Sequence, residues 1–535
     1  MGGMDFDMVA APGGGEMTMK ASRQFCFFIL VLSLAVARPA LCLQARSGQQ
    51  PPEYKELMSA MRIEDLNARL KELERIRAAY PQSRYSTAID GAIAVARIGL
   101  APDVETIVKL QQPVFQSAQG TGRIFAYYSA SMQILRHKKV AQFDKKKVTK
   151  TVEGYVADGL KLASDPEFIK TIPPDQRDYT MSNAPTLYLA LALAYLNESR
   201  ADKSQKSLQD YVKSGGLQEK TYHYVLGSTM GALGKDKEAL DSYLRAAAEN
   251  FEDAAEKAQE YWIKVNGSSE GFEAGLEARQ RQLPFPVEHF EPTKEWKEKT
   301  VLAELFTGSE CPPCVATDLG FDGLIESFGP EYLAVLVYHL PIPRPDPIMN
   351  MATRRRGRFY GVNSAPAVFF DGESFAGGGG PRQLAEEKYK LYAAEIKARV
   401  YNQTELRLKV SAKLAGDDIK VRFSADKDLA GVDYQFALVQ EEEIYRGGNG
   451  IVYHKMVVRD FLTLNRAAAK DKNARFNIVQ AEKDAEARLA EVEKERGFTF
   501  EERHTRIDRT RLLVVFFLQD GLTKKVYNAA VAKLE

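Results

Sequence analysis

Two cysteines, Cys311 and Cys314, are the residues of this 535-residue chain whose type and spacing are best suited to chemistry. They enclose two prolines and stand between an apolar segment, 301–306, and a helix-like segment, 315–328. Thiols at this spacing can close into a disulfide, and a helix N-terminus favours the negative charge of a thiolate on the first cysteine. The pattern predicts a thiol–disulfide exchange site in which Cys311 attacks and Cys314 resolves the mixed disulfide.

The N-terminal segment indicates the compartment. Lys20 and Arg23 precede an apolar run, 25–37, in the layout of a secretory signal peptide. The run is about 13 residues long, short of the ~20 residues that a spanning helix needs. We expect residues 1–45 to be a signal peptide with an upstream extension, which leaves a periplasmic or secreted protein without a stable transmembrane anchor.

The cysteine count supports a redox role. The other two cysteines, Cys26 and Cys42, fall within the predicted signal segment. The mature chain would then carry only Cys311 and Cys314. In an oxidising compartment, a single pair this close together favours a redox role over a structural one, because so short a loop gains little chain-entropy stabilisation.

The charge balance gives no indication of a nucleic-acid partner. The 73 Lys and Arg residues balance 72 Asp and Glu residues, so no basic field points to nucleic acid. A hydrophobic content of 45% is typical of a folded protein, and 535 residues predict about three domains.

Residues 52–281 carry the pattern of consecutive helices. Proline and glycine pairs interrupt this pattern at intervals and mark interhelical turns. Apolar residues recur at three- and four-residue spacing, as at Leu57, Met61, Leu66, Leu70, Leu73 and Ile76. The segment predicts paired antiparallel helices.

One part of this helical segment resembles a tetratricopeptide repeat. The packing residues of such a repeat correspond to His223, Leu226, Gly227, Met230, Ala239, Tyr243 and Ala246. Gly227 and Ala239 would let two helices approach closely, and Tyr243 would fill the gap between them. The resemblance implies a helical-repeat region that binds a protein segment; an irregular helical bundle is the alternative.

A proline-containing linker, 282–299, separates the helical segment from a different pattern. Residues 332–340 are almost all apolar, which is typical of a central parallel strand covered on both faces. A third strand, 367–371, follows Ala365 and Pro366, and a charged amphipathic helix ends near residue 401. The segment therefore predicts an α/β domain over residues 300–401.

The order strand, Cys-x-x-Cys, helix, strand, helix, proline, strand, turn and helix resembles the thioredoxin-like superfamily. The resemblance implies a cis peptide bond between Ala365 and Pro366, with Pro366 facing the cysteine pair and its neighbouring backbone free to bind an extended substrate. Pro313, at the first helical position, would limit the freedom of the loop without costing a hydrogen bond.

Segments around the pair are also similar to the bacterial, extracytoplasmic Omp28-related group. Near the pair they are 304–308, 338–339, 346–347 and 358–361. A more distant region, 445–450 with His454 and 458–459, is similar to the strand-loop region of the same group. Two residues depart from the superfamily pattern. Glu310 replaces the tryptophan that often precedes the first cysteine, and its charge would oppose a thiolate; Ala367 stands where threonine is common.

Three further features near the pair are candidates for chemistry. Glu304, on the strand before the pair, is a candidate proton relay to Cys314. His339 and the two cysteines would supply only three metal ligands where a strong zinc site has four, so we predict no metal and no cofactor. The glycine run 377–380 lacks the Lys-Ser/Thr of a phosphate-binding loop and is expected to be a flexible loop.

Residues 402–535 show alternating polar and apolar positions with turn signals, which predict a β-sandwich. A segment of alternating charge, 481–496, predicts an exposed helical insertion.

The sequence thus predicts a multidomain α + α/β + β protein: TPR-like helical repeats, a central thioredoxin-like domain and a C-terminal β-sandwich. We expect a thiol–disulfide oxidoreductase that acts on protein substrates with a redox partner and binds a protein ligand on its repeats. An envelope binding or assembly protein with a non-catalytic pair is the alternative, and metal delivery is a third hypothesis. The direction of exchange stays open.

Overall fold

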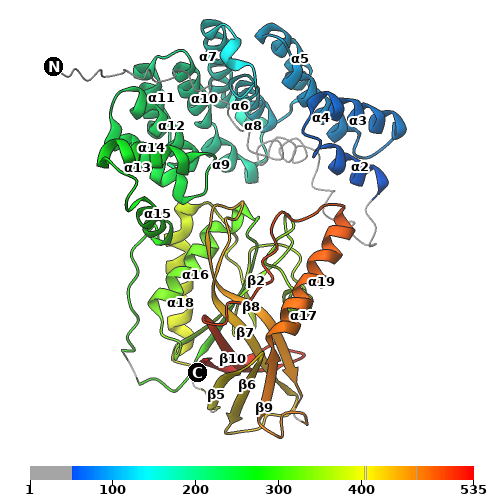
Figure 1. Cartoon of the computed structure of the whole chain (residues 1–535), viewed down its shortest axis with the longest axis vertical. Coiled ribbons are helices and arrows are strands. Elements are labelled where there is room, and N and C mark those ends of the chain that lie inside the picture. The colour runs from blue at the N-terminus through cyan, green and yellow to red at the C-terminus, as the bar shows by residue number, and fades with distance from the viewer. Residues whose placement is uncertain (1–50, 294, 403, 405, 466, 535) are drawn as a thin grey trace, which may run out of the picture.

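The computed structural model describes residues 51–534 except 294, 403, 405 and 466. The predicted signal peptide lies outside the described residues. An N-terminal helical-repeat region is followed by a mixed α/β region and then by a C-terminal β-rich region, as the sequence predicts (Figure 1). None of the helices in the described ranges is long and apolar enough to cross a membrane.

The helical region runs from α2 to α15. Its elements are α2 (Pro52–Ala60), α3 (Leu66–Ala79), α4 (Ser86–Leu100), α5 (Val104–Ser117), α6 (Gly122–Leu135), η2 (Val140–Gln142), α7 (Lys145–Ala163), α8 (Pro166–Thr171), α9 (Pro174–Asn183), α10 (Thr186–Asn197), α11 (Ala201–Lys213), α12 (Lys220–Ala232), α13 (Asp236–Ala248), α14 (Ala254–Asn266) and α15 (Phe272–Arg281). Side chains of Asp65, Asp103 and Asp144 accept backbone N–H groups three residues on, which fixes where α3, α5 and α7 begin.

The packing expected of the repeat-like segment is present between α12 and α13. Ala239 and Tyr243 are buried, at 0% and 3% exposure. A methyl group built on Gly227 would lie 2.9 Å from the Tyr243 ring, so only glycine allows this approach. The spacing of small and large residues in the sequence therefore corresponds to a real helix contact.

A single eight-stranded sheet organises the rest of the chain. Its strand order is β11-β10-β7-β8-β2-β1-β3-β4. The strands are β1 (Val301–Thr307), β2 (Leu333–His339), β3 (Ala367–Phe370), β4 (Glu373–Phe375), β7 (Val432–Ile444), β8 (Tyr453–Leu464), β10 (Leu512–Asp520) and β11 (Val526–Lys533). β1 and β2 are parallel, whereas β3 runs antiparallel to β1 and β4 antiparallel to β3.

Helices cover both faces of the central strands. Val301, Ala303 and Leu305 of β1 belong to one core with α16 (Val315–Ser327) and α18 (Ala385–Val400). Leu302 and Phe306 point to the other face and pack with α17 (Met351–Tyr360). Figure 1 shows α16 and α18 on one side of the sheet and α17 on the other. This two-sided burial explains why β1 and β2 are mostly apolar.

The C-terminal region contains two facing sheets, but one of them is not separate. β8 pairs in parallel with β2 through Val457 and Val337, so the central sheet continues across the predicted boundary at residue 402. The second sheet, of β5 (Leu408–Ala415), β6 (Asp418–Ala425) and β9 (Asn473–Asn477), packs on the C-terminal strands of the first. This contact places β8 beside the edge of β2 that would otherwise be open to pairing with another chain.

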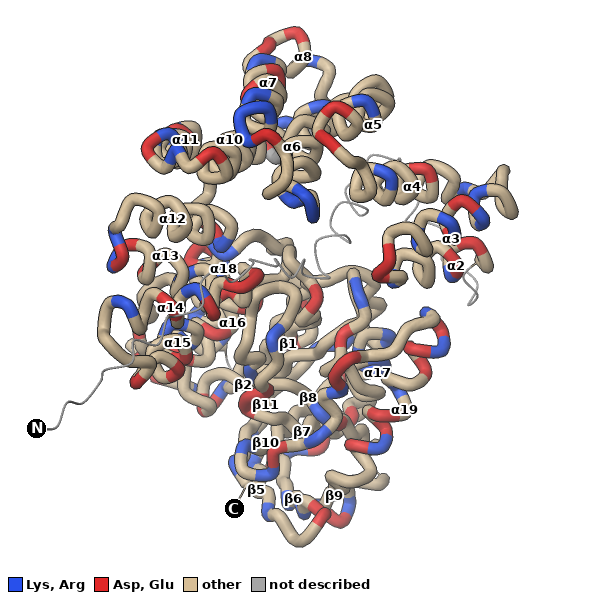
Figure 2. The backbone as a smooth tube through the Cα atoms, turned by 45° about the horizontal axis from the view of Figure 1, so that its top comes forward, with Lys and Arg blue, Asp and Glu red and all other residues tan. Residues whose placement is uncertain are grey.

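The predicted charged insertion is a helix, α19 (Ile478–Arg496). Charges of both signs alternate along it (Figure 2). One face is nevertheless buried, since Leu489 and Val492 pack with Met349 of the α/β region. The alternation of charge describes the outer face of α19, and its apolar face anchors it to the protein.

Replacing Gly227 by Ala tests the close contact between α12 and α13. The added methyl group would overlap Tyr243, and overpacking should lower the free energy of unfolding by about 1–3 kcal/mol. The matched control is Gly154→Ala in α7, where nothing lies within 4 Å of the new methyl group; this change should raise stability by roughly 0.5–1 kcal/mol. Denaturant unfolding followed by circular dichroism measures both. Equal effects of the two substitutions would contradict the contact.

Candidate functional site

Cys311 and Cys314 form a disulfide where β1 passes into α16. The Cys311–Cys314 bond is 2.06 Å long, and the Cα atoms are 5.4 Å apart. Pro312, Pro313 and Cys314 form a short 3-10 turn, η3 (Pro312–Cys314), that leads directly into α16. The pair therefore stands at the N-terminal end of a helix.

Pro366 lies beside the pair. The peptide bond between Ala365 and Pro366 is cis, and the Ala365 carbonyl oxygen lies 4.0 Å from Cys311 Sγ. A strand, β3, begins directly after Pro366 and pairs with β1. The fold thus brings together Cys311, Cys314, Ala365 and Pro366, which are far apart in the sequence.

Both cysteines are completely buried, at 0% exposure. The backbone of the glycine run 377–380 lies against Pro313, which stands between the two cysteines, and against the first turn of α16. Gly380 N donates to Pro313 O at 2.7 Å, and Ala316 N donates to Gly380 O at 3.1 Å. The run is predicted to be a flexible loop; in the structure, these two bonds attach it to the start of α16.

A second loop, 445–450, covers the segment before Cys311. Asn449 N donates to Ser309 O at 3.0 Å, and Gly448 N donates to a Glu310 carboxylate oxygen at 3.0 Å. Arg344 lies 3.6 Å from the other oxygen of Glu310. Burial raises the pKa of Glu310, and Gly448 and Arg344 oppose that rise. The negative charge expected to oppose a thiolate is thus countered by its own partners.

A buried carboxylate ties β2 to the loop before the pair. Asp346 Oδ2 accepts Ser309 N–H at 2.6 Å and lies 2.9 Å from His339 Nδ1. Burial opposes ionisation, but His339 and backbone N–H groups outweigh it and hold the pKa of Asp346 below its usual value. Burial, with His339 nearby, lowers the pKa of His454 to about 3 and keeps that ring neutral. Asp346 therefore positions the segment that precedes Cys311.

Glu304 points away from the pair. It lies on the face of β1 that packs against α17, whereas α16 covers the opposite face. Its carboxylate accepts hydrogen bonds from Arg356 at 2.7 and 2.9 Å and from Tyr338 at 3.0 Å. Gln519 of β10 accepts a further hydrogen bond from Arg356 at 2.7 Å. Glu304 is therefore part of a buried hydrogen-bond network and does not point toward Cys314.

Two acidic residues of α16 were not singled out from the sequence. Asp318 and Asp322 follow Cys314 at four-residue intervals, so one side of the helix carries all three. Burial raises the pKa of Asp318 well above its usual value and that of Asp322 to about 7. The i, i+4, i+8 spacing from the cysteine was the signal that could have identified them.

The helical region touches the α/β region close to this site. Asn250 Nδ2 donates to Arg446 O at 3.5 Å, within the loop that covers Glu310. Arg281 at the end of α15 binds the Glu442 carboxylate at 2.6 Å. At the opposite end of the helical region, Arg62 donates to Gly497 O at 2.6 Å, just beyond α19. The helical region therefore contacts the sheet-containing part at two separate places.

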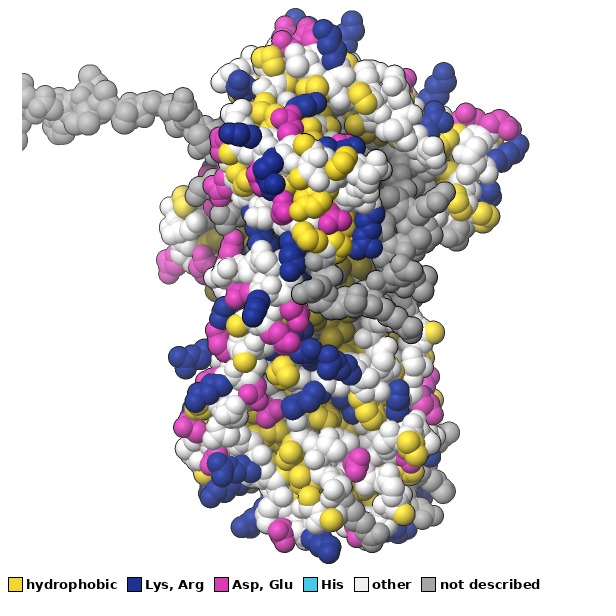
Figure 3. Space-filling model, turned by 90° about the vertical axis from the view of Figure 1, so that its right-hand side faces the viewer, with side chains coloured by type: hydrophobic (Ala, Val, Ile, Leu, Met, Phe, Trp, Pro, Cys, Tyr) yellow, Lys and Arg dark blue, Asp and Glu magenta, His cyan; other side chains and the backbone are white. Residues whose placement is uncertain are grey.

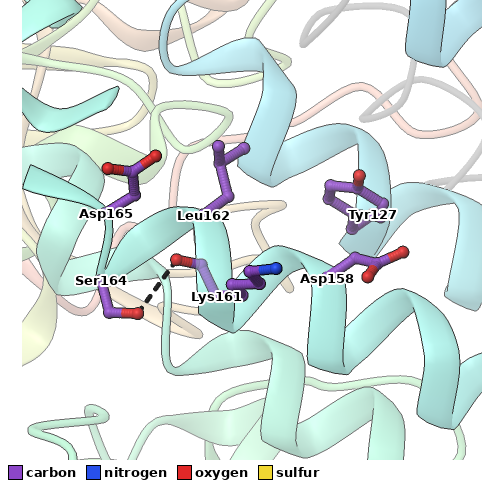
Figure 4. A pocket seen from close by; sticks show the side chains of 6 residues that line it. All are labelled: Tyr127, Asp158, Lys161, Leu162, Ser164 and Asp165. Atoms are coloured by element: carbon purple, nitrogen blue, oxygen red, sulfur yellow. Dashed lines mark hydrogen bonds between the residues drawn. The ribbon is translucent and has the colours of Figure 1, made fainter. Parts of the chain in front are cut away.

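Two hollows lie away from the cysteine pair. One of about 530 Å³ is lined by α6 and α7 residues, among them Tyr127, Asp158 and Lys161 (Figure 4). Another, of about 500 Å³, lies between Lys299 and Arg399.

Within the described ranges, no group of three or more His, Cys, Asp or Glu side chains could hold a metal ion. On the face in Figure 3, basic and acidic side chains are interspersed.

Replacing Arg356 by Ala would leave the Glu304 carboxylate buried without its cation. Removing one partner of a buried ion pair costs about 3–5 kcal/mol, so we expect a loss of this size in the free energy of unfolding. Arg358→Ala, at an exposed position of the same helix, is the control and should change stability by less than about 0.5 kcal/mol. Guanidinium denaturation measures both. An Arg356→Ala variant with the stability of the wild type would contradict the structural role of Arg356.

The raised pKa of Asp322 predicts a pH dependence of stability. An unfolded Asp releases its proton near about pH 4, whereas the folded protein keeps it to about pH 7. Because the folded state binds more protons in this window, the free energy of unfolding falls as pH rises from about 4 to about 7. Asp322→Asn removes this contribution, so the variant should gain stability relative to the wild type between about pH 4.5 and about pH 8. Parallel curves for the two proteins would refute the assignment.

Comparisons with known proteins place the chain in no family. No family model and no curated protein matches it. Two similar solved structures are HBP35 of Porphyromonas gingivalis and TTC0263, a thermophilic TPR protein of Thermus thermophilus. The first has a TM-score of 0.28 and 14% identity and covers 45% of this chain and 77% of its own. The second has a TM-score of 0.24 and 13% identity and covers 42% and 96%. Scores this low leave the functional argument to the geometry of the site.

Proposed function

We propose that the protein is an extracytoplasmic thiol–disulfide oxidoreductase of protein substrates, with residues 300–401 as a thioredoxin-like domain. The observation that carries the proposal is the Cys311–Cys314 disulfide at the start of α16, beside the cis Ala365–Pro366 bond. A helix N-terminus stabilises a thiolate, and a second thiol within reach resolves a mixed disulfide.

The strand arrangement supports the same proposal. The order β2-β1-β3-β4, with β3 antiparallel to its neighbours, agrees with the fold that the sequence resemblance implies. The remaining proposed boundaries are a signal peptide at 1–45, repeats at 52–281, a linker at 282–299 and a C-terminal unit at 402–535. That last unit would share a sheet with the redox domain rather than fold apart from it.

The proposed exchange needs only the pair and two substrate thiols. A substrate thiolate attacks Cys311 Sγ, the Cys311–Cys314 bond breaks, and Cys314 leaves as a thiolate and takes up a proton. A second substrate thiolate then attacks the substrate sulfur of the mixed disulfide and releases Cys311. The substrate is oxidised to a disulfide and the pair is reduced; the reverse sequence reduces a substrate. Which direction operates depends on the reduction potential of the pair.

The helical repeats are proposed to bind a protein partner. Antiparallel helix pairs present an extended surface on which polypeptide segments bind in repeat proteins. The contact of Asn250 with loop 445–450 would hold such a partner near the redox site. No nucleic-acid or cofactor role is proposed.

One observation favours a second candidate function. Both cysteines are fully buried, which suits a structural disulfide in an envelope binding or assembly protein. In that case the repeats and the β-rich region would carry the function. Metal delivery is not proposed, because the described residues offer no cluster of ligands.

Replacing Cys314 by Ser distinguishes the two functions. The variant cannot resolve a mixed disulfide, so Cys311 should accumulate as covalent adducts with proteins of a cell-envelope extract. These adducts should appear on non-reducing gels and disappear with dithiothreitol. Cys311→Ser is the matched control and should trap no protein. Absence of adducts, together with no thiol–disulfide exchange by the wild-type protein in vitro, would favour the binding or assembly function.

A further inference from the structure

The glycine run 377–380, called the glycine loop here, places Gly379 between Pro366 and Pro313, the second of the two prolines between the cysteines. A methyl group built on Gly379 would lie 2.0 Å from Pro313 O and 3.1 Å from Pro366 Cδ. The Gly379 backbone therefore fits between Pro313 and Pro366 only because it has no side chain.

The loop binds there through its backbone. Gly380 exchanges hydrogen bonds with Pro313 and Ala316 at 2.7 and 3.1 Å. Pro313 lies within the turn between the two cysteines, and Ala316 lies in the first turn of α16. The loop thus uses backbone pairing, which is how a substrate segment would be held next to the pair.

Two side chains donate hydrogen bonds to the loop. Thr317 Oγ1 donates to Gly378 O at 3.2 Å, and the buried Lys388 ammonium donates to Gly377 O. Lys388 lies on α18, so both helices that cover this face of the sheet hold the loop. The outer side of the loop faces solvent at Gly378, where no neighbour lies within 4 Å of an added methyl group.

We infer that the glycine loop is an internal occupant of the substrate groove, and that Gly379 sets how firmly it competes with a substrate. The inference rests on the proposed function and adds a selection step to it. A substrate reaches Cys311 Sγ only when its extended backbone displaces the loop from Pro313 and Pro366. The groove accordingly favours an extended, unfolded segment with little side-chain bulk next to its own cysteine.

The glycine loop would then limit the rate at which the disulfide is reduced. Reduction by dithiothreitol forms a mixed disulfide on a protein cysteine, breaks the Cys311–Cys314 bond, and ends with two protein thiols and cyclic oxidised dithiothreitol. The first attack requires access to a sulfur atom of a residue that is 0% exposed. Its rate therefore reports how often the loop leaves.

The test compares dithiothreitol reduction of the full chain with Gly379→Ala and Gly380→Ala variants, measured by maleimide labelling of the released thiols. Gly379→Ala should speed reduction about tenfold, since its methyl group collides with backbone at Pro313 and expels the loop. Gly380→Ala is the matched control. Its methyl group comes closest to the end of the exposed Leu384 side chain, which can move aside, so the rate should stay within about twofold of wild type.

A second variant covers the case in which Gly379→Ala does not fold. Lys388→Met removes the bond to Gly377 and keeps the apolar stem, and it should speed reduction about threefold. Wild-type reduction as fast as in the guanidinium-unfolded chain, or no acceleration in either variant, would overturn the inference. Dithiothreitol needs no natural partner. Faster reduction of the Gly379→Ala or Lys388→Met variant, combined with no adducts on the Cys314→Ser variant, would reject the proposed function but keep the inference about the glycine loop.

Discussion

The buried ion pair between Glu304 and Arg356 joins parts of the protein that are far apart in sequence. Glu304 lies on β1, Arg356 on α17, and Gln519 on β10 completes the network. Two charges at 0% and 3% side-chain exposure are tolerated only because each is paired and hydrogen-bonded. The same pairing orients β1, and the cysteine pair follows the C-terminal end of β1.

The shared sheet decides how the cysteine site relates to the rest of the chain. Because β8 pairs with β2, the loop between β7 and β8 reaches the segment before Cys311. That loop binds Ser309 and Glu310 and also contacts Asn250 of the helical region. A C-terminal sandwich on a flexible tether would supply none of these contacts. The β-rich region is therefore part of the wall of the site.

Burial of the disulfide separates two properties that sequence motifs usually imply together. The Cys-Pro-Pro-Cys pattern and the position at a helix start favour a reactive thiol. The glycine loop is hydrogen-bonded to Pro313 and Ala316, and loop 445–450 is hydrogen-bonded to Ser309, so both loops bind the backbone next to the cysteine pair. In the proposed function, reactivity would depend on the helix start and access on loops that lie far from the cysteines in sequence.

Local pattern was enough to determine the cysteine pair, the helical character of the N-terminal region and the close contact at Gly227, because each depends on residues near one another in sequence. The apolar character of β1 and β2 likewise follows from burial on both faces. Only the tertiary structure decided the direction in which Glu304 points. A strand buried on both faces shows no alternation of polar and apolar residues from which the two faces could be assigned. The tertiary structure also decided that the sheet crosses residue 402 and that the glycine loop is hydrogen-bonded to Pro313 and Ala316. Neither the pairing of distant strands nor the backbone hydrogen bonds of a loop can be read from the pattern of side chains.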